Sequence, residues 1–498
     1  MEWFWYLCYI SVLIGLAGYG FHRLTIIYLY LKHARTTPKP LKKWDELPLV
    51  TVQLPMFNEL YVAERLLESV AKLDYPKDKL QIQVLDDSTD ETVEIASAAV
   101  QKLVDQGFDA TYIHRTDRTG FKAGALENGT KSAKGDFLFI LDADFVPNAD
   151  VIKKTIHHFT DEKIGMIQTR WGHINRNYNF LTRVQALFLD GHLELEQTAR
   201  NRSGRFFTFN GTAGIWRKQC IEDAGGWHHE TLTEDMDLSY RAQLKGWKFI
   251  FFNRVETPAE LPVDMDGFKN QQHRWTKGSI QCCKKLLVRI WKSEFPLYVK
   301  LEATAHLTAN FAYLLLIALC FLIPNARQPE ALGPYAVYLI NGPIFFFASV
   351  SVILFYLTSQ LALHKEKWWK EIIYLPLLLA LGIGMSINNA RAVLEALFNH
   401  ESGFVRTPKY GIAKKKTEDT SAWKKSRYRA LKNLNPIVEF AFGCFFTILI
   451  ADAALSGNWA SAVLLLPFPI GFFYCSVSSL IRLLPESEKQ SVTSSNVE

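Results

Sequence analysis

The sequence has none of the usual cysteine motifs and no excess of charge of either sign. Its seven cysteines form no C-x-x-C pair, and four of them lie inside apolar runs, where cysteine behaves as a small hydrophobic residue. We therefore expect neither a zinc site nor a disulfide framework. The 56 basic and 50 acidic residues are too evenly balanced for a nucleic-acid-binding protein, so we expect no nucleic-acid partner. The small positive net charge suits a protein resting on an anionic membrane leaflet.

Long apolar runs divide the chain into membrane and water-soluble parts. With 498 residues, 49% of them hydrophobic, and a mean hydropathy of zero, the chain lies between a soluble enzyme and a multi-span membrane protein. Five runs approach the ~20 residues that span a bilayer as a helix. They lie at 4–31, 301–323, 335–363, 437–455 and 461–483. The first run lacks a basic segment before it and a small-residue cleavage site, so we interpret it as a span rather than a signal peptide.

Basic flanks predict how these spans are oriented. Lysine and arginine residues at 32–43 follow the first run, so the positive-inside rule places the N-terminus outside and the next polar block in the cytosol. A sixth apolar stretch, 372–387, lies between a basic loop at 364–370 and a basic segment at 406–432, which includes Lys415. Because both basic segments should be cytosolic, we interpret 372–387 as interfacial or re-entrant. About five spans are predicted.

The polar block has the pattern of an α/β domain. Short β-rich runs alternate with helix-like segments, as in doubly wound folds. Strands are expected at 50–54, 82–85, 111–114, 137–141 and 164–168. We divide the chain into an N-terminal span with its basic flank (1–46), this cytosolic domain (47–261), interfacial amphipathic helices (262–298) and a C-terminal membrane domain (299–498). Ligands of open α/β sheets collect beyond the carboxyl ends of the strands, so the residues there are the first candidates for a site.

Two of the expected strands deliver carboxylates to the same edge of the sheet. Asp86 and Asp87 follow the strand at 82–85, while Asp142 and Asp144 follow the apolar strand at 137–141. A single Asp-x-Asp is common in turns, but two acidic pairs directly after two strands favour a binding site. Hard oxygen ligands at this spacing suit Mg²⁺ or Mn²⁺, which water and substrate phosphates complete. A diphosphate-linked substrate would fit.

Two more segments combine chemical and structural signals. Lys122 supplies a point charge for phosphate among small residues that let backbone approach a ligand, although a solvated loop entering a helix would look the same. Glu234 and Asp235 open a helix-like stretch. Thr233 and Asp235 would serve as a helix cap with an acidic first turn, and this capping role does not exclude catalysis.

The stretch at 271–291 is amphipathic and ends just before the second span. Its first residues include Gln271, Arg274 and Trp275. An interfacial helix with a snorkelling arginine and an anchoring tryptophan explains this pattern, and such a helix is compatible with a functional role.

Taken in order, these segments resemble the processive family 2 glycosyltransferases, which include cellulose, chitin and hyaluronan synthases. The likeness is greatest to the cellulose synthase-like A and C groups, the mannan, glucomannan and xyloglucan-backbone synthases. It rests on Gln53-Leu-Pro-Met-Phe-Asn-Glu59, Leu85-Asp-Asp-Ser-Thr-Asp90, Lys122-Ala-Gly-Ala-Leu126, Asp142-Ala-Asp-Phe145, Asn210-Gly-Thr-Ala-Gly-Ile-Trp-Arg217, Glu234-Asp-Met-Asp-Leu238, Leu244-Lys-Gly-Trp-Lys-Phe249 and Gln271-Gln-His-Arg-Trp275. The likeness covers about 50–275 and extends to the layout of the spans.

The resemblance implies a fold and a set of roles. The fold is an α/β GT-A domain, that of nucleotide-diphospho-sugar transferases, inserted in an α-helical transmembrane domain. The residues implied in donor binding are Asp86, Asp87, Lys122, Gln271, Arg274 and Trp275. Asp142 and Asp144 would meet the metal-bound diphosphate, and Asp235, with Glu234 beside it, would be the general base. The acceptor side would comprise Asn210, Gly211, Thr212 and Trp275. Phe404, Thr407 and Lys409, in a cytosolic segment at about 389–435, look like the gating loop that closes over the donor in cellulose synthases.

The sequence therefore predicts a membrane-embedded inverting β-glycosyltransferase that uses a nucleoside-diphosphate sugar and Mg²⁺ or Mn²⁺. The donor is expected to be UDP-glucose or GDP-mannose, the acceptor a growing β-glucan or β-mannan, and the remaining partners membrane lipids. The catalytic domain would face the cytosol, at a bacterial inner membrane or at the Golgi or plasma membrane.

Two alternative functions are also compatible with parts of the sequence. A near alternative adds one sugar to diacylglycerol or ceramide, and it is told from polymer synthesis by its glycolipid product. A transporter with a nucleotide-responsive domain is disfavoured, because the spans hold few charges, chiefly Glu302, Glu439 and Asp452 near their ends, and no evident inverted repeat.

Overall fold

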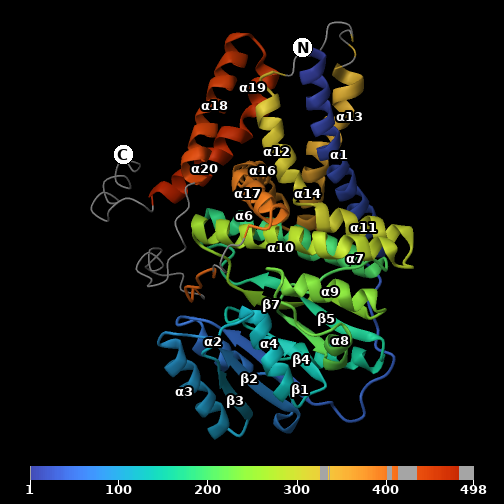
Figure 1. Cartoon of the computed structure of the whole chain (residues 1–498), viewed down its shortest axis with the longest axis vertical. Coiled ribbons are helices and arrows are strands. Elements are labelled where there is room, and N and C mark those ends of the chain that lie inside the picture. The colour runs from blue at the N-terminus through green and yellow to red at the C-terminus, as the bar shows by residue number, and fades with distance from the viewer. Residues whose placement is uncertain are drawn as a thin grey trace.

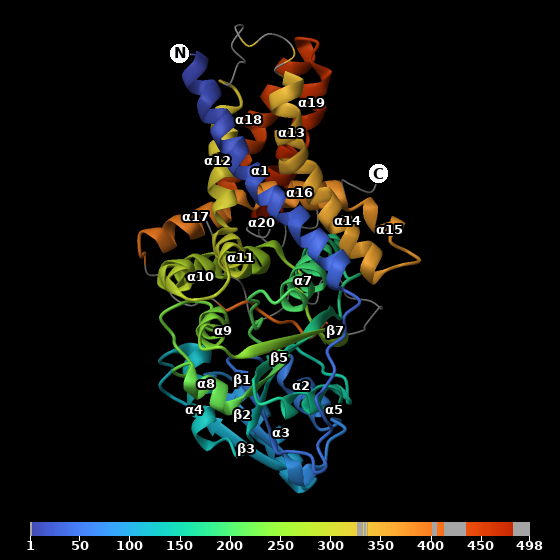
Figure 2. The same ribbon diagram turned by 90° about the vertical axis from the view of Figure 1, so that its right-hand side faces the viewer.

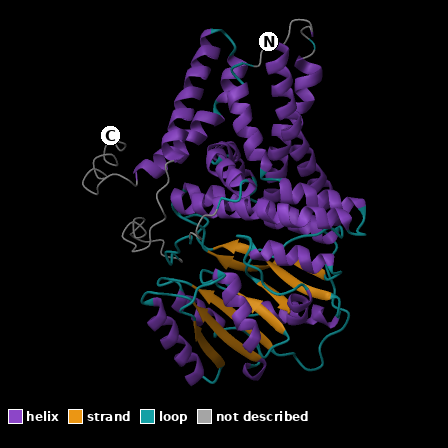
Figure 3. Cartoon of the chain, viewed as in Figure 1, coloured by secondary structure: helices purple, strands orange, loops and turns teal. Residues whose placement is uncertain are grey.

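The computed structural model describes residues 2–325, 332, 335, 337–400, 406–412 and 435–481. An α/β unit lies at one end and a group of long helices at the other, with further helices lying across the molecule between them (Figures 1 and 2). The strands gather in the α/β unit (Figure 3). The N-terminus lies at the end of the helical region that is farther from the sheet (Figure 1).

A seven-stranded mixed sheet forms the centre of the α/β unit within the described residues, in the order β3-β2-β1-β4-β6-β5-β7. Its strands are β1 (Val50–Met56), β2 (Leu80–Asp86), β3 (Asp109–His114), β4 (Phe137–Ile140), β5 (Ile164–His173), β6 (Gly214–Arg217) and β7 (Lys248–Ala259). β1 to β4 run parallel, whereas β6 is antiparallel to both β4 and β5. β1, β2 and β4 are buried along their whole lengths, as expected of strands covered on both faces.

The five predicted strands are confirmed, with shifted ends, and two strands were missed. β6 is only four residues long, too short to give a periodic signal. The second half of β7 reads Asn253-Arg-Val-Glu-Thr-Pro-Ala259 and is partly exposed, so it lacks an apolar run. Helices and short turns cover the sheet: α2 (Ala63–Val70), η1 (Lys77–Lys79), α3 (Thr92–Asp105), α4 (Phe121–Ser132), α5 (Val151–Thr155), η2 (Ile156–Thr160), α8 (Lys218–Asp223) and α9 (Glu234–Leu244).

A layer of helices lies across the molecule between the sheet and the long helices (Figure 1). It comprises α6 (Phe180–Asp190), the π-helical turn η3 (Gly191–Glu196), α7 (Gln197–Arg202), α10 (Met265–Lys292) and α11 (Leu297–Thr308). The amphipathic helix predicted at 271–291 is confirmed as α10, but it begins earlier, at Met265. Its start is fixed by the Asp264 carboxylate, which accepts a hydrogen bond from the Gly267 N–H at 2.9 Å.

The long helices supply four candidate spans, Glu2–His33, Leu339–Leu363, Asn435–Leu455 and Trp459–Leu480, and up to six if two bent pairs are each one span, within the described residues. The elements are α1 (Glu2–His33), α12 (Phe311–Leu322), η5 (Val337–Asn341), α13 (Gly342–Phe345), η6 (Phe346–Val350), α14 (Ser351–Leu363), α15 (Trp369–Ile372), α16 (Leu375–Gly384), α17 (Ser386–Leu397), α18 (Asn435–Leu455), α19 (Trp459–Leu465) and α20 (Pro467–Leu480).

The apolar run at 301–323, predicted as a span, is bent in the structure, and it crosses the membrane only if the bent pair counts as one span. α11 and α12 are bent by 57°, and α11 belongs to the layer across the molecule. Buried polar contacts hold it there: Arg200 Nε donates to Glu302 Oε1 at 2.9 Å, and the His306 ring lies 2.9 Å from the Tyr240 hydroxyl. The stretch at 372–387 falls within a second pair, Trp369–Gly384 and Ser386–Leu397, bent by 42°. Its interfacial or re-entrant position stays a prediction.

Candidate active site

A pocket opens where the carboxyl ends of β1 and β4 meet the start of α9 and the first turns of α10. Most of the residues singled out from the sequence line it: Asp87, Lys122, Asp142, Asp144, Asn210, Gly211, Glu234, Asp235, Gln271, Arg274, Trp275, Thr407 and Lys409. These residues come from segments spread over more than half of the chain. The fold therefore brings together in one place the candidates for donor, metal, base and acceptor roles.

The carboxylates after β4 are held by two lysines. Lys122 Nζ lies 2.5 Å from Asp142 Oδ1, and Lys409 Nζ lies 2.5 Å from Asp144 Oδ2. The Asp142 N–H donates to Thr212 Oγ1 at 2.8 Å, which fixes the start of this turn. Asp144 is buried, and its Oδ1 has no hydrogen-bond partner among the described residues.

This donor set fits a divalent cation that also takes ligands from a substrate. Asp142 and Asp144 supply hard carboxylate oxygens, and one oxygen of Asp144 is uncommitted. The described residues contain no group of three or more acidic, histidine or cysteine side chains that could hold a metal ion. A cation here would complete its shell with water and diphosphate oxygens, as Mg²⁺ and Mn²⁺ commonly do.

Asp235 stands in the first turn of α9 beside a glycine that leaves room for it. Gly211 has a φ of +81°, and a Cβ at that position would lie 3.0 Å from Asp235 Oδ2. The Gly211 carbonyl accepts a hydrogen bond from Lys122 Nζ at 2.8 Å. Thr233 occupies the N-cap position as predicted, but its side chain makes no capping hydrogen bond. Its hydroxyl lies near Cys282 instead.

Electrostatics in the pocket favour a proton acceptor at Asp235. Loss of hydration, followed by repulsion from the Glu234 carboxylate, raises the pKa of Asp235 from 3.8 to about 7. Lys122 and Arg274 share this environment. Burial alone would lower the pKa of Lys122, yet Asp142 and Glu234 raise it, so the lysine stays charged. The pocket thus combines a carboxylate of nearly neutral pKa with fixed positive charge.

Aromatic and apolar side chains form one wall of the pocket, on the side of the layer of helices. The Trp275 ring on α10 lies 6.4 Å from the Trp171 ring at the end of β5, measured between centroids. Leu189 and Leu261 pack in the same cluster and also line the pocket. Trp171 was missed from the sequence, because a tryptophan at a strand end carries no motif of its own. Such a wall suits the apolar face of a sugar ring.

Asp86 and Asp87, the two carboxylates predicted to bind the nucleotide, lie in different surroundings. Asp86 is fully buried, where its two oxygens accept hydrogen bonds from the Tyr112 hydroxyl at 2.7 Å and the Ser88 N–H at 2.9 Å. The structure does not bring Asp86 into the pocket lining. Asp87 does line the pocket, and Arg115 binds both of its oxygens at 2.8 and 2.6 Å.

Other lining residues lie in or beside the recognised motifs but were not singled out. The Arg118 guanidinium sits 3.2 Å from the centre of the Phe57 ring. Glu59 receives two hydrogen bonds from Arg406, at 3.0 and 2.5 Å. Phe57 and Glu59 lie in the motif at 53–59, and Arg118 lies just before the motif at 122–126; these positions were the available signal.

The short segment at 406–412 passes along the pocket. Thr407 and Lys409 line it, and the Tyr410 hydroxyl donates to Asp264 Oδ2 at 2.9 Å, beside the start of α10. Phe404, the third residue predicted for a gating loop, lies outside the described residues, and so does Lys415. The gating role of this segment stays a prediction.

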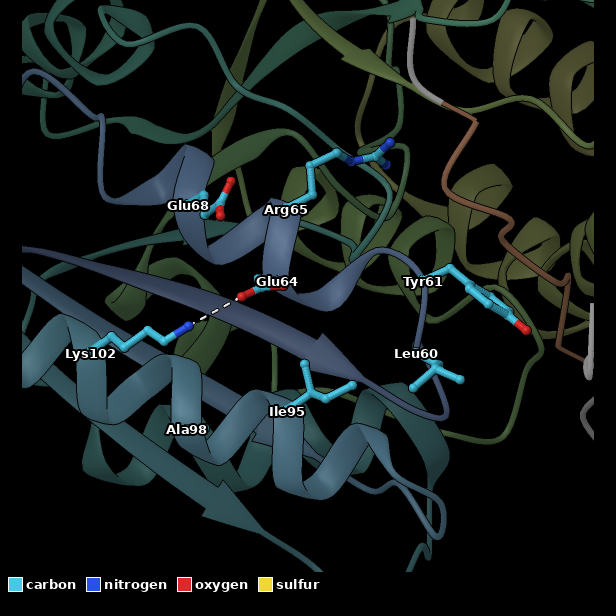
Figure 4. A pocket seen from close by; sticks show the side chains of 8 residues that line it. All are labelled: Leu60, Tyr61, Glu64, Arg65, Glu68, Ile95, Ala98 and Lys102. Carbon is cyan, nitrogen blue, oxygen red and sulfur yellow. Dashed lines mark hydrogen bonds and ion pairs between the residues drawn. The ribbon is translucent and has the colours of Figure 1, made fainter. Parts of the chain in front are cut away.

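A more open groove lies elsewhere, between α2 and α3 (Figure 4). Its lining comprises Leu60, Tyr61, Glu64, Arg65, Glu68, Ile95, Ala98 and Lys102. It contains a single solvent-exposed ion pair, Glu64 with Lys102 at 3.2 Å. The groove offers no strand-end carboxylates, so the pocket at the strand ends is the candidate active site.

The sheet order, the strand-end carboxylates and the lysine and arginine side chains beside them define a GT-A glycosyltransferase domain carried by a helical region with candidate membrane spans. The family model "Glycosyltransferase like family 2" matches residues 48–278. Together with curated mannosyltransferases that are 32–34% identical over 80% of the chain, this match shows that the chain belongs to this family and is a hexosyltransferase. The resemblance seen in the sequence is confirmed.

Curated relatives are similar over most of the chain. Glucomannan 4-beta-mannosyltransferase 1 of Oryza sativa subsp. japonica is 34% identical, over 80% of this chain and 77% of its own length. The enzyme of the same name from Cyamopsis tetragonoloba is 32% identical, over 80% of this chain and 75% of its own length. A mannosyltransferase from Pyrobaculum calidifontis, solved with GDP-Man and Mn²⁺, shares the fold at 19% identity with a TM-score of 0.51, covering 79% of this chain and all of that one.

Proposed function

We propose that this chain is an inverting β-mannosyltransferase that takes mannose from GDP-mannose and adds it repeatedly to a β-linked mannan or glucomannan. The observation that carries the proposal is the identity of 32–34% with glucomannan 4-beta-mannosyltransferases over 80% of the chain. Of the two donors expected from the sequence, those relatives favour the mannosyl donor over UDP-glucose. The mannosyltransferase solved with GDP-Man and Mn²⁺ has the same fold, which is compatible with this choice.

Asp235 would act as the general base. A hydroxyl of the acceptor sugar attacks the anomeric carbon of the donor and gives its proton to the Asp235 carboxylate. The new C–O bond forms as the bond from the anomeric carbon to the diphosphate breaks, and the electron pair leaves with GDP. A carboxylate with a pKa of about 7 can accept that proton at neutral pH and still be ionised beforehand.

The leaving diphosphate requires positive charge. Mg²⁺ or Mn²⁺ held by Asp142 and Asp144 would supply part of it at the departing oxygens. Lys122 and Arg274, both in the pocket lining, provide fixed charge from two different helices. The arginine carries five donors in a rigid fork that matches phosphate oxygens. These residues bind and orient the donor whichever acceptor is used.

Repeated transfer requires an acceptor path that retains the product. Trp171, near the end of β5, and Trp275, on α10 of the layer of helices, both line the pocket, where they can stack on the terminal sugar of a growing chain. The acceptor-side residues Asn210, Gly211 and Thr212 fit this assignment by location: Asn210 and Gly211 line the pocket, and Thr212 holds the Asp142 backbone.

The proposal is tested by product analysis of the purified full chain in detergent. Radiolabelled GDP-mannose, UDP-glucose and GDP-glucose are supplied separately with Mn²⁺, and the products are digested with β-mannanase and β-glucanase. We expect GDP-mannose to give an alkali-insoluble or long soluble product that β-mannanase degrades. A β-glucan made from UDP-glucose would overturn the donor assignment, and a mannosyl lipid extracted into chloroform would overturn the polymer assignment.

We also propose that the catalytic domain faces the cytosol. The basic flank after α1 and the basic loop before α15 support this orientation through the positive-inside rule. In sealed inside-out vesicles, an impermeant maleimide should label Lys367→Cys. It should spare the matched variant Glu2→Cys, which lies at the end of α1 farther from the basic flank. The reverse pattern of labelling would contradict the orientation.

A further inference from the structure

Arg65 lies behind the candidate active site, in the lining of the groove between α2 and α3, and contacts two residues of the active-site lining. It belongs to α2, and Figure 4 shows its side chain extending away from the Glu64–Lys102 ion pair on the same helix. One guanidinium nitrogen, Nη1, binds Glu260 Oε1. The other, Nη2, donates to the backbone carbonyl of Asp144 at 3.3 Å. The fork therefore joins a residue just after β7 to one of the two carboxylate residues after β4.

Glu260 is a buried carboxylate in the pocket lining. It follows the last residue of β7, and its side chain is only 4% exposed. Without a cationic partner, a carboxylate so buried would carry an uncompensated charge where the donor's diphosphate is expected. The contact with Arg65 supplies that partner.

The turn that carries Asp144 is anchored at several neighbouring points. The Asp142 N–H bonds Thr212 Oγ1, and the Val146 N–H bonds the carbonyl of Pro258 at 2.9 Å, which ties the turn to β7. Between these anchors, the Asp144 carbonyl accepts from Arg65. Since Asp144 Oδ1 has no partner among the described residues, the position of this carboxylate depends on its backbone and on Lys409.

We propose that Arg65 is a positioning residue for the metal-binding carboxylates: its fork holds Glu260 and the Asp144 backbone together and thereby sets the affinity of the Asp142–Asp144 pair for a divalent cation with nucleotide. This inference rests on the proposed function. Arg65 itself touches neither donor nor acceptor. It acts through Asp144, as partners behind metal ligands commonly do.

The test measures binding of GDP to the full detergent-solubilised chain by calorimetry at a series of Mn²⁺ concentrations. Four variants are compared with wild type: Arg65→Gln, Arg65→Lys, the double variant Arg65→Gln with Glu260→Gln, and Glu64→Gln. The last removes a charge from the same helix at an exposed position, so it is the matched control. Donor KM and kcat are measured for each variant, and the thermal midpoint reports folding.

Loss of the fork should raise the Mn²⁺ concentration needed for half-maximal GDP binding by about 10- to 100-fold in Arg65→Gln. Arg65→Lys should recover part of this loss at an unchanged thermal midpoint, because one ammonium can neutralise Glu260 but cannot span both acceptors. Glu64→Gln should match wild type. The double variant should stay impaired, because it removes the charge of Glu260 without restoring the tie to Asp144.

Three results would overturn the inference in distinguishable ways. Recovery of wild-type Mn²⁺ dependence in the double variant would show that Arg65 only neutralises Glu260. Unchanged Mn²⁺ dependence in Arg65→Gln, while wild type binds GDP with Mn²⁺, would remove the positioning role and leave the proposed function standing. Absence of Mn²⁺-dependent GDP binding in wild type itself would overturn the proposed function and the inference together.

Discussion

The candidate active site and the layer of helices behind it both concentrate charged residues, but the two regions use them differently. In the pocket, Asp235 stands beside a second carboxylate, Glu234, whose repulsion adds to the effect of burial in raising the pKa of Asp235. In the layer, a buried lysine is enclosed and paired. Lys269 of α10 is 1% exposed and donates to Glu439 Oε2 at 2.6 Å, to the Cys475 carbonyl at 3.0 Å and to Ser479 Oγ at 3.1 Å.

The difference between the pocket and the layer shows what each arrangement of charged side chains contributes. Carboxylates that repel one another cost stability, and they are retained where a proton or cation must be bound during turnover. The lysine of the layer satisfies all three of its donors and joins α10 to α18 and α20, which belong to two candidate spans. We therefore expect substitutions in the pocket to reduce catalysis with little loss of stability, and substitutions in the layer to do the reverse.

The largest expected effect on the pocket side comes from Asp235→Asn. An amide cannot accept the acceptor's proton, so kcat should fall by about 10²- to 10⁴-fold. The thermal midpoint should not fall, because the substitution relieves repulsion from Glu234. Initial rates with GDP-mannose and a melting curve in the same detergent provide the two measurements. An active Asp235→Asn enzyme would mean that the base lies elsewhere.

On the layer side, Lys269→Met should destabilise the chain by about 3–5 kcal/mol, because it leaves Glu439 buried without its cation. Adding Glu439→Leu should restore most of that stability. Denaturant unfolding in mixed micelles measures both variants, with Lys292→Met at the exposed end of α10 as the control. Equal stability of Lys269→Met and wild type would show that the buried pair does not anchor α10.

The strand-end residues could be predicted because each signal is local. Asp142 and Asp144 follow an apolar strand directly in the sequence, and the rule that ligands collect at strand ends supplies the rest. The same holds for the start of α9 at Glu234, where an acidic turn follows a threonine. Placing them in one pocket required the resemblance to known glycosyltransferases, since no local pattern specifies how distant segments meet.

Long-range contacts explain what the sequence did not predict. α11, on one side of the bend, is bound through Glu302 to Arg200, a residue about a hundred positions away in the sequence. No local pattern distinguishes Arg65, and its contact with the Asp144 carbonyl is visible only in the folded chain. β6 was not predicted because its own four residues carry no periodic pattern. Its place in the sheet is specified by pairing with β4 and β5, which lie elsewhere in the sequence.

A smaller effect is expected from pH. With Asp235 as the base, kcat/KM should rise about tenfold per unit as pH increases toward about 7 and level off above it. Over the window from 3.8 to about 7 the folded chain keeps a proton that the unfolded chain has lost, so this residue's contribution to stability falls as pH rises. A rate profile between pH 5.5 and 8.5 tests the first statement, and a flat profile would contradict it.

The smallest expected change in rate comes from Trp275→Ala. Removing the ring should leave GDP binding unchanged and shorten the polymer, because the terminal sugar loses its stacking surface. Size-exclusion analysis of the labelled product measures chain length. An unchanged length distribution would assign Trp275 to anchoring α10 at the interface, the alternative that the sequence left open.

The central claim, that base and metal-binding carboxylates are separate functions within one pocket, is tested most directly by calorimetric binding of GDP with Mn²⁺ to Asp235→Asn and Asp144→Asn side by side. We expect Asp235→Asn to bind as wild type does while failing to turn over, and Asp144→Asn to bind at least about tenfold more weakly, because it loses a ligand to the cation. Wild-type binding by Asp144→Asn, or lost binding in Asp235→Asn, would contradict the claim.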